Sequence, residues 1–279
     1  MSDLRRQGLT SYLARHGRAA SPELDRLCAQ KDAHTSLLFW FTELPAAITE
    51  ARRTKKPILS LRLLGRLDEE LSCANSRFFR KLLYPQPAIN QLLRDHFVLH
   101  WQSVRPVPRV TIDFGGGKRI EKTLTGNSCH VVLDPDGRPA DVLPGLFSPT
   151  VFHALLVRSH GYALANRAQL ADLHRRALAE PPPVVPPSRA MRASMIAPTK
   201  HMVEMPVLRA VAPVGTSDDA VDADTRQNLA LHARVHHAFA SGAQWSSVDA
   251  MVSRIYSDLF LMPIDDPALG LDVPDPFAA

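Results

Sequence analysis

The residues around Cys73 are of types that could support thiol chemistry. Apolar side chains at helical spacing run from Ser72 to Tyr84 and stop at Pro85, so Cys73 is predicted at the start of a helix. Backbone N–H groups and the positive end of the helix dipole stabilise a thiolate at such a position. Arg77, one turn further on, adds to this effect, whereas the carboxylates at positions 68–70 oppose it. Two interpretations of Cys73 stay open, a nucleophile or a cysteine without activity.

Two histidines have a spacing that can hold a metal. His232 and His236 are four residues apart on one face of a predicted helix, and His237 is adjacent. A zinc helix of the H-E-x-x-H type carries Glu directly after the first His, where this sequence has Ala233. We therefore expect these histidines to lie on a solvated helix edge, and we predict no metal site and no cofactor in this chain.

Other motifs indicate structure rather than chemistry. Gly115-Gly116-Gly117 is followed by Lys118 and Arg119, whereas a phosphate-binding loop needs Ser or Thr after the lysine and then a helix. A hairpin turn is therefore the better interpretation of the three glycines. No G-x-S-x-G sequence marks a serine hydrolase. Trp101 on a predicted strand is expected in the core, so no nucleic-acid partner is predicted.

Composition places the chain among globular proteins. It has 279 residues, of which 45% are hydrophobic and 22% charged, and its net charge of +5 is spread along the chain. Three cysteines do not make a disulfide framework. No apolar run approaches the roughly 20 residues that span a bilayer, so no membrane association is expected. Arg15, His16 and Arg18 interrupt the window where a secretory signal would lie, which favours the cytoplasm.

The elements expected around Cys73 alternate between helices and strands. Prolines end the helices, and short apolar runs mark buried strands. In chain order they are a helix over 43–56, a strand over 58–64, helices over 73–84 and 87–96, a strand over 97–101, a hairpin of 110–114 and 118–124, strands over 131–133 and 140–143, and a helix over 148–158. This order predicts an α/β fold with a mixed sheet.

Several of these segments resemble thioredoxin-like proteins. Lys56-Pro57-Ile58-Leu59 resembles the entry to the family's first core strand, and Cys73-Ala74-Asn75-Ser76 resembles its active-site loop. His130 to Gly137 resembles the strand and turn that follow the family's cis-proline. The resemblance covers roughly Leu44 to Arg158 and extends to a group of bacterial proteins in this superfamily. It implies a thioredoxin-like fold, with a central mixed sheet flanked by helices.

The resemblance also implies a site with one cysteine instead of two. The C-x-x-C motif becomes C-x-x-S, no Trp precedes Cys73, and the place of the cis-proline falls at Ser128 or Cys129. The implied catalytic residues are Cys73, as nucleophile, and Ser76, as its hydrogen-bond partner. The implied binding residues are Asn75, Arg77, Ser128, Cys129 and His130. A Cys73–Cys129 disulfide stays open, although strand alternation puts only one of Cys129 and His130 on the site face.

The resemblance implies two alternative functions. One is monothiol chemistry, in which Cys73 forms mixed disulfides with protein thiols but has no second thiol to release the partner. The alternative is a redox-inactive, thioredoxin-fold scaffold that binds a protein partner. The oligomeric state stays open.

Flanking regions complete the predicted organisation. Residues 1–36 form a helical N-terminal extension in which Cys28 is a buried apolar residue, and residues 37–180 form the thioredoxin-like domain. Residues 181–221 contain a polyproline run and are expected to be a stiff linker. Residues 222–279 form a helical C-terminal region with helices over 225–240 and 247–260.

Overall fold

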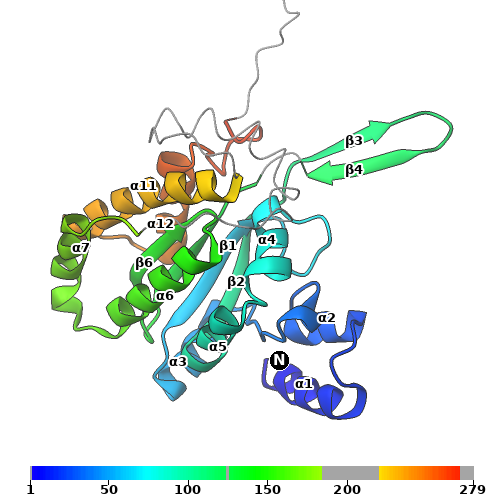
Figure 1. Cartoon of the computed structure of the whole chain (residues 1–279), viewed down its shortest axis with the longest axis horizontal. Coiled ribbons are helices and arrows are strands. Elements are labelled where there is room, and N and C mark those ends of the chain that lie inside the picture. The colour runs from blue at the N-terminus through cyan, green and yellow to red at the C-terminus, as the bar shows by residue number, and fades with distance from the viewer. Residues whose placement is uncertain (1, 124–125, 184–219, 271–279) are drawn as a thin grey trace, which may run out of the picture.

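A four-stranded mixed sheet forms the centre of the molecule in the computed structural model, which describes residues 2–123, 126–183 and 220–270 (Figure 1). The central strand β1 (Ile58–Leu64) is parallel to β2 (Val98–Arg105) and antiparallel to β5 (Ser128–Leu133). The edge strand β6 (Pro139–Pro144) is antiparallel to β5, which gives the order β2-β1-β5-β6. The predicted α/β class with a mixed sheet is thereby confirmed.

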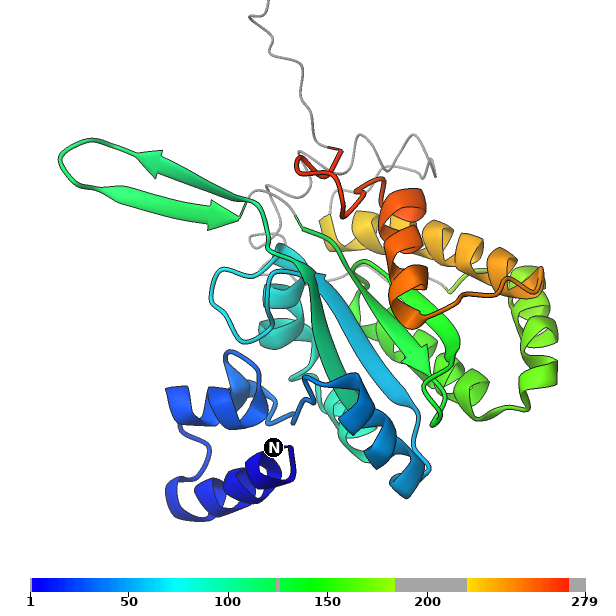
Figure 2. The same ribbon diagram turned by 180° about the vertical axis from the view of Figure 1, so that it is seen from behind.

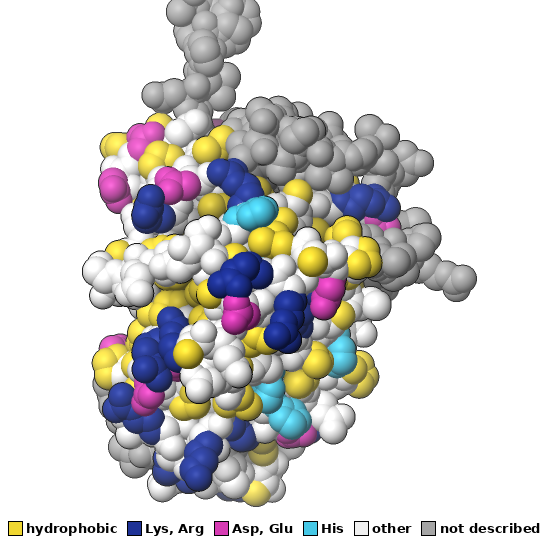
Figure 3. Space-filling view, turned by 90° about the vertical axis from the view of Figure 1, so that its left-hand side faces the viewer, with side chains coloured by type: hydrophobic (Ala, Val, Ile, Leu, Met, Phe, Trp, Pro, Cys, Tyr) yellow, Lys and Arg dark blue, Asp and Glu magenta, His cyan; other side chains and the backbone are white. Residues whose placement is uncertain are grey.

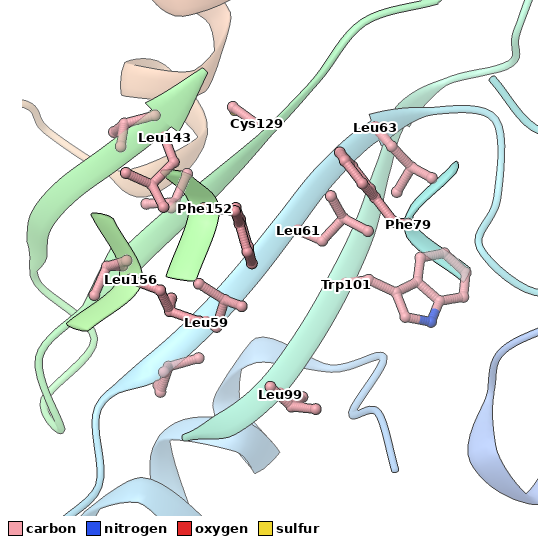
Figure 4. Packing of buried hydrophobic residues seen from close by; sticks show 14 of the residues in the cluster. Leu59, Leu61, Leu63, Phe79, Leu99, Trp101, Cys129, Leu143, Phe152 and Leu156 are labelled. Carbon is pink, nitrogen blue, oxygen red and sulfur yellow. The ribbon is translucent and has the colours of Figure 1, made fainter. Parts of the chain in front are cut away.

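Helices cover both faces of this sheet, which is why β1 is buried along its whole length and carries an almost continuous apolar run. Figure 4 shows Leu59, Leu61 and Leu63 of β1 on the face that also packs Phe79 and Phe152. The alternate β1 residues point to the other face, where Arg62 reaches Asp249 of a C-terminal helix. The two faces are therefore an apolar one and one that contains a buried charge.

Most helices begin close to their predicted positions, although the helix predicted to end at 158 continues to Leu164. Prolines stand in the first turn of four of the described helices, where a missing N–H costs nothing. The helical elements around the sheet are α3 (Leu44–Thr54), α4 (Ala74–Phe78) continued by the π-helical turn η2 (Phe79–Leu83), α5 (Pro87–His96), α6 (Pro149–Leu164), η3 (Arg167–Gln169), α7 (Leu170–Ala179), α11 (Ala220–Ala240), α12 (Val248–Arg254) and η4 (Ile255–Leu259). Figure 2 shows α3 and α12 on the face opposite to α4, α5 and α6.

The N-terminal helices have a small core of their own. Helices α1 (Ser2–His16) and α2 (Pro22–Cys28) and the short turn η1 (Ala33–Thr35) enclose a cluster that contains Leu24 and Cys28. The Ser21 hydroxyl accepts the Leu24 N–H and caps α2. Cys28 is fully buried, as predicted, and burial raises the pKa of its thiol to about 12.

A two-stranded arm leaves the sheet between β2 and β5. It is formed by β3 (Arg109–Asp113) and β4 (Arg119–Thr123), and the three glycines of its turn all have positive φ. The predicted hairpin is thereby confirmed. Both views show the arm extending away from the body of the molecule (Figures 1 and 2).

The C-terminal helices share the main core. Val221 and Leu231 of α11 and Met251 of α12 belong to the same apolar cluster as the strands, and α11 packs against β6 and α7. Helix α11 begins earlier than predicted, at Ala220, and most of the expected linker, residues 184–219, lies outside the described residues. Among the described helices, none combines the length and apolar character that crossing a bilayer requires.

Candidate functional site

Cys73 lies where the sequence predicts, at the N-terminus of α4. Its backbone is extended, and its Sγ accepts the Ser76 backbone N–H at 3.4 Å, so the thiol caps the helix. Because η2 continues α4 without a break, the capped helical segment runs to Leu83. The cysteine therefore has a structural role at this helix start, whatever its chemistry.

The side chains predicted around Cys73 bond to one another and to nearby backbone groups. The Ser76 hydroxyl bonds to Ser72 Oγ at 2.6 Å and to the Cys73 carbonyl oxygen at 2.8 Å. The resemblance implies this hydroxyl as the partner of the thiol, but the backbone N–H of Ser76 occupies that role. Arg77 donates to the Ser72 carbonyl at 2.9 Å and to Thr123 Oγ1 at 3.1 Å, which ties the helix to the base of the arm.

Asn75 connects α4 to the start of β5. Its Nδ2 donates to Asn127 Oδ1 at 3.2 Å and to Ser128 Oγ at 3.1 Å. The structure thus brings together Asn75 and Ser128, two of the residues that the resemblance implies for binding. It also adds Asn127, which was not predicted, although its place before a buried strand after Gly126 was a visible turn signal.

The backbone at Gly126 closes the site. A Cβ built on Gly126 would lie 2.4 Å from Cys73 Cβ, so only glycine fits against the cysteine at this point. Cys73 is 0% exposed. Thiol exchange requires that a thiolate reach the sulfur of another molecule, and buried structural cysteines are inert. The geometry around Cys73 is that of a packed joint between α4 and the start of β5, here called the Cys73 joint and made of Cys73, Asn75, Ser76, Arg77, Gly126 and Ser128.

Cys129 and His130 do not belong to this joint. Register places Cys129 opposite Arg62 and His130 opposite Leu61, so the two side chains point to different faces of the sheet. Ser128 and His130 share the face of α4, and Cys129 points to the other one. Cys129 therefore faces away from the Cys73 joint, and the disulfide that the sequence left open is not formed. All three cysteines are described and none forms a disulfide, and burial raises the pKa of Cys129 to about 12.

His130 is a core residue on the apolar face. Its Nε2 lies 2.8 Å from the Tyr84 hydroxyl, and its ring packs between Phe79 and Phe152. Burial lowers the pKa of His130 to about 3. The imidazole is therefore neutral at physiological pH, and its predicted binding role has no support in its contacts.

The predicted solvated edge of α11 is also wrong. His232 and His236 are 2% and 4% exposed. They face Asp141 of β6, and one ligand atom from each of the three residues lies within 4.8 Å of the others. The sequence could not show this burial, because β6 and α7, which cover this face of α11, are distant in the chain.

Comparison with protein-family models, with curated proteins and with solved structures finds no match to this chain.

Proposed function

We propose that this chain is a redox-inactive, thioredoxin-like scaffold that binds a protein partner. The observation that carries the proposal is the closed Cys73 joint, in which the thiol caps α4 and lies fully buried against Gly126. Support for a thioredoxin-like fold comes from the order of elements, with α4 and α5 between β1 and β2 and with α6 after β6. A cytoplasmic location, where thiols stay reduced, is part of the proposal.

The β3–β4 arm is the surface that supports partner binding. Val110, Ile112 and Phe114 alternate along one side of the arm and are 39%, 44% and 60% exposed. Isolated two-stranded ribbons are marginally stable, and contiguous exposed apolar side chains mark interaction sites. Residues 109–123 carry four basic and two acidic side chains. The expected partner is a protein with an apolar groove bordered by acidic residues.

Thiol accessibility tests the redox-inactive assignment. In a Cys28→Ser, Cys129→Ser variant, Cys73 is the only thiol, and its reaction with an aromatic disulfide reagent can be followed directly. We expect reaction in the native protein at the rate of local or global opening, rising steeply with urea. Rapid reaction without denaturant, together with a stable mixed disulfide with a reduced model protein after oxidation, would overturn the assignment.

Rapid reaction of Cys73 and a stable mixed disulfide would instead favour monothiol exchange with protein thiols. Its structural support is the position of Cys73 at a helix N-terminus, with a backbone N–H already directed at Sγ and with Arg77 one turn away. Access to the thiol would then require the joint to open.

A photo-crosslinking amino acid tests the arm. Placed at Phe114, it should form a protein adduct in cells that express the chain, whereas the same group at Val157 of α6, which is 49% exposed, should not. Equal labelling at both positions would contradict partner binding by the arm.

A further inference from the structure

Buried titratable side chains gather at the edge of the sheet distant from the Cys73 joint. Asp141 lies on the edge strand β6, His174 on α7, and His232 and His236 on α11; these four residues are here called the Asp141 cluster. Asp141 pairs with Val132, near the opposite end of β5 from Ser128. The proposed scaffold function gives this cluster no role.

Hydrogen bonds fix the tautomer of His236. His174 Nε2 lies 2.9 Å from the Ala140 carbonyl oxygen, so this nitrogen carries a proton and donates it. In the neutral ring, His174 Nδ1 is then an acceptor, and it lies 2.7 Å from His236 Nδ1, which must be the donor. His236 Nε2 is therefore unprotonated. It is buried and has no hydrogen-bond partner among the described residues.

This arrangement is the one that a metal-binding histidine requires. A ligating imidazole is neutral, offers one bare nitrogen, and has its other N–H held by a second group. An orphaned buried acceptor is costly, and coordination of a cation would satisfy it.

Asp141 supplies the negative charge. Its Oδ1 accepts the Val142 N–H at 2.8 Å and lies 2.9 Å from His232 Nε2, and its Oδ2 accepts the Ser159 hydroxyl at 2.6 Å. All three contacts place donors at the carboxylate, which favours its charged form. The carboxylate is oriented by two donors besides His232, so its geometry would survive the replacement of the His232 proton by a cation.

A cavity adjoins the two histidines. It has a volume of about 620 Å³, and His232, His236, Arg158, Arg226 and Glu180 lie in its wall. Arg158 bonds weakly to Glu180, but its Nε and the Nη1 of Arg226 are buried without a hydrogen-bond partner among the described residues. Figure 3 views the side of the molecule on which α7 lies, where basic, acidic and apolar side chains are interspersed.

We propose that Asp141, His232 and His236 bind a divalent first-row transition metal of the zinc class, with an open coordination position toward the cavity and with Arg158 and Arg226 placed to hold an anionic oxygen ligand. Two imidazoles and one carboxylate are a common donor set for zinc sites that keep a position open. When the cation binds His232 Nε2, the proton that this nitrogen donates to Asp141 passes to the other ring nitrogen or to solvent. The ligand atoms, within 4.8 Å of one another, need only small side-chain movements to reach the separations of about 3–4 Å found around a metal.

Metal titration of the full chain tests the site. After treatment with a chelator, the protein should bind Zn²⁺ with one-to-one stoichiometry in calorimetry and should give Co²⁺ absorption bands typical of four- or five-coordination. His236→Ala should weaken binding at least 100-fold, whereas His237→Ala, which changes an exposed neighbour on α11, should leave it unchanged. Circular dichroism shows whether each variant is folded, and Asp141→Asn provides a second ligand variant of nearly the same shape.

Two results would overturn the metal site: no saturable one-to-one binding by the wild-type chain, or equal affinity of the wild type and folded His236→Ala. Inorganic phosphate and acetate test the open position, since each should shift the Co²⁺ spectrum. Arg226→Gln should remove that shift, and an unchanged spectrum in the wild type would overturn the anion part. None of these outcomes bears on Cys73, so the scaffold proposal stands or falls separately.

Discussion

The Cys73 joint and the Asp141 cluster are both buried, yet they differ in what their polar atoms do. Around Cys73, the side chains of Ser76, Asn75 and Arg77 bond to neighbouring groups, and Gly126 leaves no space beside the thiol. In the Asp141 cluster, His236 Nε2 has no partner among the described residues and a cavity adjoins it. Satisfied groups stabilise a fold, whereas a fixed, unused lone pair beside a cavity is prepared for a ligand. The C-x-x-S motif at Cys73 carries the family resemblance, but the Asp141 cluster is the region better arranged to bind a ligand.

Removing the carboxylate of the cluster should have the largest effect on stability. Asp141→Ala leaves the Val142 N–H, the Ser159 hydroxyl and His232 without their acceptor in a fully buried setting. We expect a loss of about 3 kcal/mol or more in the free energy of unfolding, measured by urea denaturation without added metal.

Asp172→Ala is the control, since Asp172 lies on α7, is half exposed and pairs only with Arg175 among the described residues. That variant should change stability by no more than about 0.5 kcal/mol. Equal effects of the two substitutions would show that Asp141 contributes no more to the free energy of unfolding than an exposed carboxylate.

Gly126→Ala tests how tightly the Cys73 joint is closed. The new Cβ would lie 2.4 Å from Cys73 Cβ, so the backbone must move, at an expected cost of about 2 kcal/mol. The same variant should speed alkylation of Cys73, because the displaced backbone no longer covers it. Gly161→Ala on α6, where no atom lies within 4 Å of the added Cβ, should be neutral or stabilising. Unchanged alkylation in Gly126→Ala would mean that other atoms bury the thiol.

Acid should destabilise the protein through its buried neutral histidines. Burial lowers the pKa of His130 to about 3, below its unfolded value near 6.5. Between these values the unfolded chain binds more protons, so this contribution to stability is complete above pH 6.5 and falls as the pH drops toward 3. Each such histidine adds a slope of about 1.4 kcal/mol per pH unit. His130→Phe should lower the slope of unfolding free energy against pH by that amount, and an unchanged slope would contradict a neutral, buried His130.

Local patterns predicted much of the fold. The apolar run of β1, the prolines that start or end helices and the three glycines of the arm act within a few residues, and the structure has these elements at the expected places. Cys73 also lies at the start of a helix, as expected.

The Asp141 cluster could not be assembled in the same way. Its residues come from β6, α7 and α11, and only the packed fold shows that α11 buries His232 and His236. One local signal was available, because Asp141 is a charged residue inside a short strand that is otherwise apolar. A buried carboxylate needs partners, and the two histidines at helical spacing can supply them.

Substitutions of Cys73 itself should have the smallest effect on the free energy of unfolding. They test whether its sulfur acts only as a helix cap. If Sγ serves only as the acceptor that caps α4, Cys73→Ser keeps the cap and should change the free energy of unfolding by about 0.5 kcal/mol or less. Cys73→Ala removes the acceptor and should cost about 1 kcal/mol more than the serine variant. Urea denaturation of the two variants measures this difference. Equal stabilities of the two variants would show that the cap contributes nothing to the free energy of unfolding. If both variants are folded but bind the partner less well, the sulfur of Cys73 has a functional role.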